Sequence, residues 1–149
     1  NQGPLLEALA AQALSIISEF TTQNLSNTPW SFARLEFHHT PGLDALAAAA
    51  LARITQLGAQ DLCSTVWSCA ALELRNDPLI DAISDAALPQ LRWAGAQGLA
   101  NLAWSFATLL VTHCPLLASI SSEAISSLWR GEFKTQEQSN LAWAFAKLQ

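Results

Sequence analysis

Cysteine and histidine are the residues of this 149-residue chain whose types and spacing invite a search for metal or nucleophile chemistry. Cys63 and Cys69 are six residues apart, so on one helix their side chains point about 120° away from each other and cannot share a metal ion. His38 and His39 fall in one predicted loop, and His113 falls in another loop two helical layers away. Because such layers lie about 8–10 Å apart, the two loops are too distant for one zinc site. We therefore expect no metal site and no cofactor.

Signatures of catalysis are absent from the sequence. It has no glycine-rich phosphate loop, no serine elbow and no HExxH pattern. The acids Asp77, Asp81 and Asp85 cluster near a predicted helix start, where the helix dipole explains them. We predict that the protein is not an enzyme and has no small-molecule substrate.

Polar side chains recur in four sets, each set at steps of four, four and three residues. These steps place a set on one arc of about 80° of a helix. We call the sixteen positions the polar ribbon and predict that they bind a partner. They are Gln23, Asn27, Ser31 and Arg34; Gln60, Ser64, Ser68 and Ala71; Gln97, Asn101, Ser105 and Thr108; and Gln136, Asn140, Ala144 and Lys147. The last position of the set varies most, from Arg to Ala, Thr and Lys.

Two interpretations of the polar ribbon stay open at this point. Its amides could bond neighbouring helices or cap turns, because buried polar groups require partners. Alternatively, they form the floor of a groove in which the variable position selects the partner. The tryptophans that border the ribbon are packing residues in the first interpretation. In the second, they are stacking platforms for bases, which need exposed faces.

The elements that carry these residues repeat along the chain. Prolines recur every 37 residues, and tryptophans follow the same period with one final interval of 39; the positions are Pro4, Pro41, Pro78 and Pro115, and Trp30, Trp67, Trp104 and Trp143. A period in this range indicates a solenoid of repeated units. Proline is favoured in the first turn of a helix. We predict an all-α fold, an α-solenoid of four two-helix repeats that stack as a right-handed superhelix of helical hairpins.

The predicted organisation is a single helical-repeat domain over 1–149. Its repeats span 4–40, 41–77, 78–114 and 115–149, and their second helices span 23–35, 60–72, 97–109 and 136–148. The apolar spacing extends the first helix of the first repeat to Phe20, and Pro89 should kink the first helix of the third. Gly58 and Gly95 should end helices in the left-handed conformation.

Composition limits the environment of the chain. Hydrophobic residues make up 51%, charged residues 13%, and the net charge is −5. The absence of methionine suggests a segment of a longer chain. Neither end has the polar cap that solenoids need, so we expect further repeats or a partner to cover both ends. Three cysteines favour a reducing or organellar interior over a disulfide framework, and no apolar run is long enough for a transmembrane segment.

The third and fourth repeats contain a recurring motif, in Leu99–Leu109 and Ser139–Leu148, which pairs Asn-Leu-Ala-Trp with a following Phe-Ala. This motif resembles the octotricopeptide repeat, whose relatives often precede a RAP domain. The resemblance implies an organellar protein, of the chloroplast or the mitochondrion, that binds single-stranded RNA.

The charge balance argues against RNA as the first choice. Neutralising phosphates supplies most nucleic-acid affinity, yet the polar ribbon carries only Arg34 and Lys147 as cations. We therefore expect a non-catalytic interaction scaffold that docks to protein subunits of a larger organellar assembly, soluble or peripheral to that complex. The alternative is a single-stranded RNA-binding module in organellar RNA processing, translation or ribosome architecture.

Overall fold

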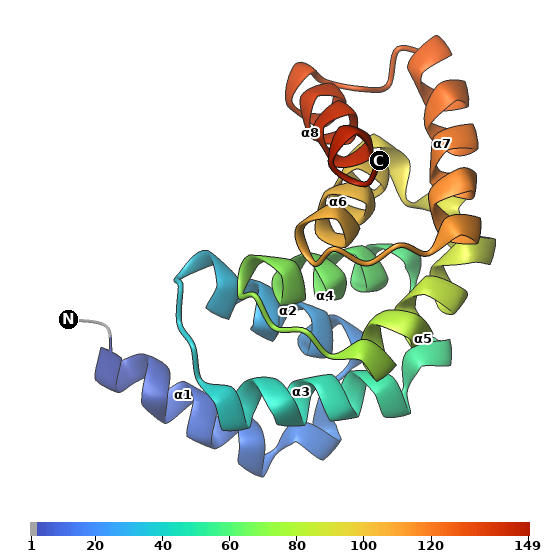
Figure 1. Cartoon of the computed structure of the whole chain (residues 1–149). Helices are drawn as coiled ribbons and strands as arrows, with labels where there is room; N and C mark the ends of the chain where they lie inside the picture. Colours follow the sequence, from blue (N-terminus) through green and yellow to red (C-terminus); the bar gives the residue numbers. More distant parts are fainter. Residues whose placement is uncertain (1–2) are drawn as a thin grey trace.

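The computed structural model describes residues 3–149, which fold into repeated helical hairpins (Figure 1). The α-helices are α1 (Gly3–Ser15), α2 (Thr22–Arg34), α3 (Thr40–Ala52), α4 (Ala59–Ala71), α5 (Asp77–Ala87), α6 (Gly95–Thr108), α7 (Cys114–Trp129) and α8 (Thr135–Lys147). Each predicted repeat contributes two of them. The expected all-α, solenoid-like fold is confirmed.

The helices form two layers. The second helices of the repeats pack side by side, α2 on α4, α4 on α6 and α6 on α8, and these are the most extensive contacts between helices. The first helices form the other layer, in which α1 packs on α3, α3 on α5 and α5 on α7 (Figure 1). As a consequence, the four parts of the predicted polar ribbon lie on consecutive helices of one layer.

Three first helices begin with a side-chain cap two residues before the repeated proline. The Nδ1 atoms of His39 and His113 accept hydrogen bonds from the backbone N–H of Gly42 and Leu116, at 3.0 and 3.2 Å. Asn76 uses its Oδ1 in the same way, accepting from Leu79 at 3.1 Å. Such caps satisfy an N–H that has no partner within the helix. His39 was expected to be an ordinary loop residue; its role as a cap is a correction.

The ends of the first helices differ from the prediction. The helix expected to reach Phe20 ends at Ser15 and is followed by a 3₁₀ helix, Ile17–Glu19, and the second repeat breaks in the same way with Ile54–Gln56. Pro89 ends α5 instead of kinking it, because it lies in the first turn of a 3₁₀ helix, Leu88–Trp93, where its missing N–H costs nothing. Only α7 runs through this region without a break, to Trp129.

The two glycines that were expected in the left-handed conformation differ in their backbone conformation. Gly95 has a φ of 67°, as predicted, and lies where the 3₁₀ helix Leu88–Trp93 gives way to α6, of which it is the first residue. Gly58 has a φ of −77° at the start of α4, so the prediction was wrong for this residue. Left-handed residues instead end the second helices, at Glu36, Glu73 and Leu110, with φ values of 51°, 54° and 54°.

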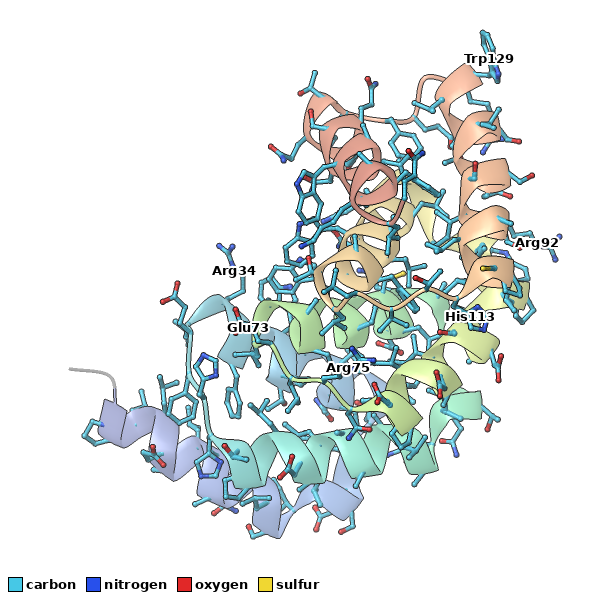
Figure 2. All side chains as sticks on the ribbon, viewed as in Figure 1. Arg34, Glu73, Arg75, Arg92, His113 and Trp129 are labelled. Atoms are coloured by element: carbon cyan, nitrogen blue, oxygen red, sulfur yellow. The ribbon has the colours of Figure 1, made fainter. Side chains whose placement is uncertain are left out.

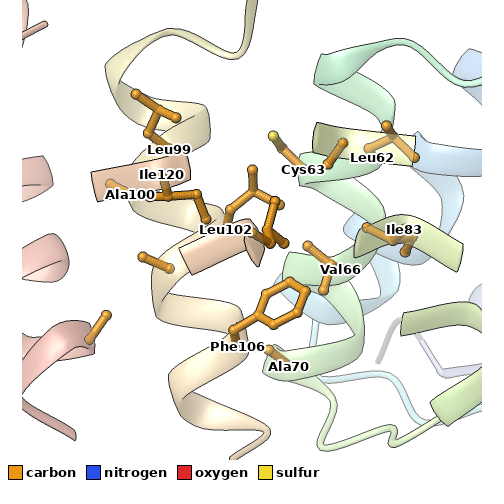
Figure 3. Close-up of a cluster of buried hydrophobic side chains, with 14 of the residues drawn as sticks. Leu62, Cys63, Val66, Ala70, Ile83, Leu99, Ala100, Leu102, Phe106 and Ile120 are labelled. Atoms are coloured by element: carbon orange, nitrogen blue, oxygen red, sulfur yellow. The ribbon is translucent and has the colours of Figure 1, made fainter. Parts of the chain in front are cut away.

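The core between α4 and α6 shows how the layers pack (Figure 3). Val66 on α4 and Leu99 and Phe106 on α6 are fully buried there. Gly98 lets the helices approach, because a Cβ atom at this residue would lie 2.9 Å from the Ala94 Cβ and 3.2 Å from the Cys63 Sγ. The inner helices α4 and α6 are therefore covered on two sides by their neighbours in the same layer, whereas α2 and α8 each have one such neighbour.

Candidate partner-binding surface

The first three of the repeated tryptophans form a ladder across α2, α4 and α6. The ring centroids of Trp30 and Trp67 are 6.4 Å apart, and those of Trp67 and Trp104 are also 6.4 Å apart. The ring planes are inclined by 38° and 31°. Trp30 is 44% exposed, whereas Trp67 and Trp104 are partly buried. The fourth repeated tryptophan, Trp143 on α8, is 45% exposed. The rings thus contribute to packing and also reach the surface.

The first two positions of every ribbon set reach the surface. The first-position glutamines Gln23, Gln60, Gln97 and Gln136 are all exposed. At the second position Asn27 is exposed, while Ser64, Asn101 and Asn140 are partly buried.

The third position does not reach the surface in three of the four sets. Ser68, Ser105 and Ala144 are 1%, 0% and 0% exposed, because this arc of the helix faces the preceding second helix. The hydroxyls of Ser68 and Ser105 donate to carbonyls of their own helices, at 2.7 and 2.6 Å. These three residues are removed from the predicted partner-binding set. Ser31 alone is exposed at this position, on the first repeat.

Most of the ribbon amides have no partner within the described chain. Over residues 3–149, the side chains of Asn27, Gln60, Gln97 and Asn101 make no hydrogen bond, and no ribbon amide bonds a neighbouring helix. The one amide pair is Gln136 Nε2 with Asn140 Oδ1, at 2.9 Å within α8.

The unpaired amides surround a hollow at the surface, together with two tryptophans. We call this hollow the amide–tryptophan groove; its lining residues are Asn27, Trp30, Gln60, Ser64, Trp67, Gln97 and Asn101. Trp30 and Trp67 were not in the predicted partner-binding set. The signal for them was their constant position, four residues before the variable ribbon position.

The fourth, variable position decides which tryptophans have a cation beside them. Arg34 Cζ lies 5.9 Å from the Trp30 ring centroid, and Lys147 Nζ lies 4.8 Å from that of Trp143. The central sets have Ala71 and Thr108 here, which cannot supply a cation. The Thr108 hydroxyl oxygen is buried and has no hydrogen-bond partner.

The helix ends beside this position carry different charges. Arg34 lies in the last turn of α2, whereas α4 has no basic residue in its last turn. An exposed glutamate follows each of the two helices, Glu36 and Glu73. Figure 2 shows the labelled Arg34 and Glu73 on the same side of the molecule. The last turn of α6 also lacks a basic residue. Arg34 and Lys147 thus lie in the last turns of the outer helices α2 and α8. At the end of α6 the Leu109 carbonyl accepts a hydrogen bond from Arg75 Nη1 at 3.3 Å, so among the second helices of residues 3–149 only the end of α4 has no cation beside it.

Both ends of the solenoid leave repeat-to-repeat contact surfaces uncovered. Leu9 is 52% exposed and its equivalent Leu46 is 3% exposed, and Leu35 is 50% exposed against 5% for Leu72. We call the surface around Leu9 and Leu35 the N-terminal end face; a shallow apolar hollow there is lined by both leucines. At the other end, Ala142 and Ala146 of α8 are exposed, whereas their equivalents Ala103 and Ala107 are fully buried.

The two buried cysteines, Cys63 and Cys69, offer little reactivity. Burial raises the pKa of the Cys63 thiol to about 12 and that of Cys69 to about 11, so both are protonated at neutral pH. Among residues 3–149, no three His, Cys, Asp or Glu side chains are grouped as metal ligands. No helix in this part of the chain is long and apolar enough to cross a bilayer.

The fold and these surfaces define a helical-repeat protein that presents a neutral groove and open end faces. A model of the RNA-editing substrate-binding complex 6 protein family matches residues 2–149, and the chain belongs to that family. No curated protein matches the sequence significantly. The matching family is not the octotricopeptide repeat that the motif in α6 and α8 resembles. The match supports the expectation that the protein is a helical subunit of a complex.

Proposed function

We propose that the protein is a non-catalytic helical-repeat scaffold that docks to protein subunits of a larger assembly. The name of its family suggests which assembly, a substrate-binding complex of RNA editing. The location that we propose is organellar, in a chloroplast or mitochondrion, and it rests on the resemblance to octotricopeptide repeats.

The observation that carries this proposal is the exposure of apolar residues at the N-terminal end face. Leu9 and Leu35 are about half exposed, although the same positions one repeat later are almost completely buried under a neighbouring hairpin. Fully burying such a leucine is worth roughly 1.5–3 kcal/mol. A partner protein or a further repeat that covers this end face recovers about half of that energy for each leucine, because the other half of the side chain is already buried.

The test is to isolate the tagged protein with its complex and measure the size of the complex before and after ribonuclease treatment. We expect the protein to stay in the complex after ribonuclease, because protein contacts hold it. The double variant Leu9→Asp/Leu35→Asp should leave the complex, since it places charge on the end face. Leu110→Asp is the matched control, at a leucine that is 64% exposed and lies away from the end faces. Release of the unchanged protein by ribonuclease alone would contradict the proposal.

The second candidate function is single-stranded RNA binding, which the exposed rings of Trp30 and Trp143 favour. Filter binding of oligouridine at two salt concentrations tests it. Micromolar or tighter affinity with a steep loss at high salt would support RNA binding, and Arg34→Glu should then weaken it. If Arg34→Glu leaves the affinity unchanged, the ribbon is not the RNA site.

A further inference from the structure

We propose that the amide–tryptophan groove binds an extended, basic peptide segment of a protein partner. This inference rests on the proposed scaffold function and names the chemistry of one contact.

The free amides of the groove match the polar groups of a peptide backbone. Each Asn or Gln side chain has an amide donor and a carbonyl acceptor, and those of Asn27, Gln60 and Asn101 are unpaired within residues 3–149. An extended peptide exposes the same two groups at every residue other than proline, in need of partners. Amides on three successive helices can therefore hold one extended chain that crosses the helices.

The spacing of the tryptophans suits the side chains of such a peptide. An extended chain rises about 3.3 Å per residue, so its alternate side chains are about 6.6 Å apart. The ring centroids are 6.4 Å apart along the ladder from Trp30 through Trp67 to Trp104. By contrast, rings inclined by 31–38° do not form the parallel walls that a base stacked between them would require.

Two tryptophans of the ladder lack a cation, and a partner can supply it. Trp30 and Trp143 have Arg34 and Lys147 beside them, four residues along the same helix. Trp67 and Trp104 have only Ala71 and Thr108 there. The end of α4, which carries partial negative charge and no basic residue in its last turn, favours a cation beside Trp67. A lysine or arginine of the peptide beside Trp67 gains both interactions, and one beside Trp104 gains the contact with the ring.

The net charge of the chain favours the same partner. It carries seven Lys and Arg against 12 Asp and Glu, a net charge of −5. Several basic residues are already engaged elsewhere: Arg75 pairs with Asp77, and Arg130 pairs with Glu132. A basic peptide is attracted by this balance, whereas an RNA backbone is repelled.

The first experiment measures the binding of fluorescently labelled eight-residue probes by anisotropy. The probes are (Lys-Thr)₄, (Gln-Thr)₄ and (Glu-Thr)₄, with a twelve-residue oligouridine as the RNA arm. We expect (Lys-Thr)₄ to bind at least tenfold more tightly than (Glu-Thr)₄. Trp67→Ala and Trp104→Ala should each weaken it at least fivefold. Trp93→Ala and Trp129→Ala are matched controls at exposed rings outside the ladder, and should change it less than twofold.

The second experiment replaces Ala71 and Thr108, the variable positions beside Trp67 and Trp104, by the basic residue types that stand beside Trp30 and Trp143. Ala71→Arg/Thr108→Lys should weaken (Lys-Thr)₄ binding at least fivefold, because the protein then fills its own tryptophan sites. The control Ala48→Arg/Ala118→Lys adds the same charge at exposed positions of α3 and α7 and should have a smaller effect. Circular dichroism confirms that each variant is folded.

The outcomes separate peptide from RNA. Tighter oligouridine binding by Ala71→Arg/Thr108→Lys, with no preference for (Lys-Thr)₄, would make the groove an RNA site and overturn the inference. Equal losses of (Lys-Thr)₄ binding in the ladder and control variants would reduce the contact to general charge attraction and also overturn it. Neither result affects the scaffold proposal, whose test is retention in the complex after ribonuclease treatment.

Discussion

Ser26 on α2 donates a hydrogen bond to Asp61 on α4, with 2.7 Å between the two oxygens, and so joins the first two repeats. Ser26 is 2% exposed and Asp61 is partly buried, so water does not easily replace the hydroxyl. The equivalent pairs in the next two interfaces are Cys63 with Gly98 and Ala100 with Glu137. The hydrogen bond between Ser26 and Asp61 is therefore found at the α2–α4 interface and not at the two interfaces that follow. The apolar contacts, by contrast, recur from repeat to repeat.

The Ser26–Asp61 contact should contribute measurably to stability. We expect Ser26→Ala to lower the free energy of unfolding by about 1–2 kcal/mol, because a partly buried carboxylate loses its donor. A double-mutant cycle with Asp61→Ala should give a coupling of at least about 0.5 kcal/mol. The measurement is urea unfolding followed by circular dichroism.

The control for this cycle is Ser15→Ala. The Ser15 hydroxyl is exposed and bonds only a carbonyl of its own helix, so its loss should cost less than about 0.5 kcal/mol. Additive effects of the Ser26 and Asp61 substitutions would show that the two side chains do not interact in solution.

The cap of α5 gives a second prediction. Asn76→Ala should destabilise the protein by about 1 kcal/mol, because the Leu79 N–H loses its acceptor. Asn76→Ser keeps a side-chain oxygen at this position and should retain most of the stability. The measurement is the midpoint of thermal unfolding of the unchanged protein and the two variants. Equal midpoints for Asn76→Ala and the unchanged protein would show that the Asn76 cap does not stabilise α5.

The three cysteines should differ in reactivity with a disulfide reagent. Cys114 is exposed, whereas Cys63 and Cys69 are buried and have pKa values raised to about 12 and about 11. At pH 8 the folded protein should release one equivalent of chromophore quickly, and the protein in guanidinium should release three. Cys114→Ser should remove the fast equivalent. Fast reaction of more than one thiol in the folded state would contradict the burial of Cys63 and Cys69.

The period of the sequence predicted the second helices closely, because Pro and Trp mark every repeat. The helix expected at 60–72 is Ala59–Ala71, and that expected at 136–148 is Thr135–Lys147. The first helices were less predictable. Apolar spacing continues smoothly from Leu14 to Phe20, yet the backbone tightens into a 3₁₀ turn there, and side-chain periodicity carries no signal for that change.

The candidate site was predicted only in part, because a helical wheel describes one helix and not its neighbours. The wheel put Ser68 and Ser105 on the same polar arc as Gln60 and Gln97, but packing of the preceding helix buries both serines. The caps at His39, Asn76 and His113 follow the 37-residue period and were detectable in the sequence. Residue identity alone does not mark this position, because it is His in two repeats and Asn in the third.

The central claim is that residues 37 places apart occupy equivalent positions, covered inside the solenoid and open at its ends. The same substitution at two equivalent leucines tests this claim, because Leu9 is 52% exposed and Leu46 is 3% exposed. We predict that Leu46→Ala lowers the free energy of unfolding by about 2–4 kcal/mol, whereas Leu9→Ala lowers it by less than about 1 kcal/mol. Equal losses for the two variants in urea unfolding would contradict the account, because the end face would then be no more open than the interior.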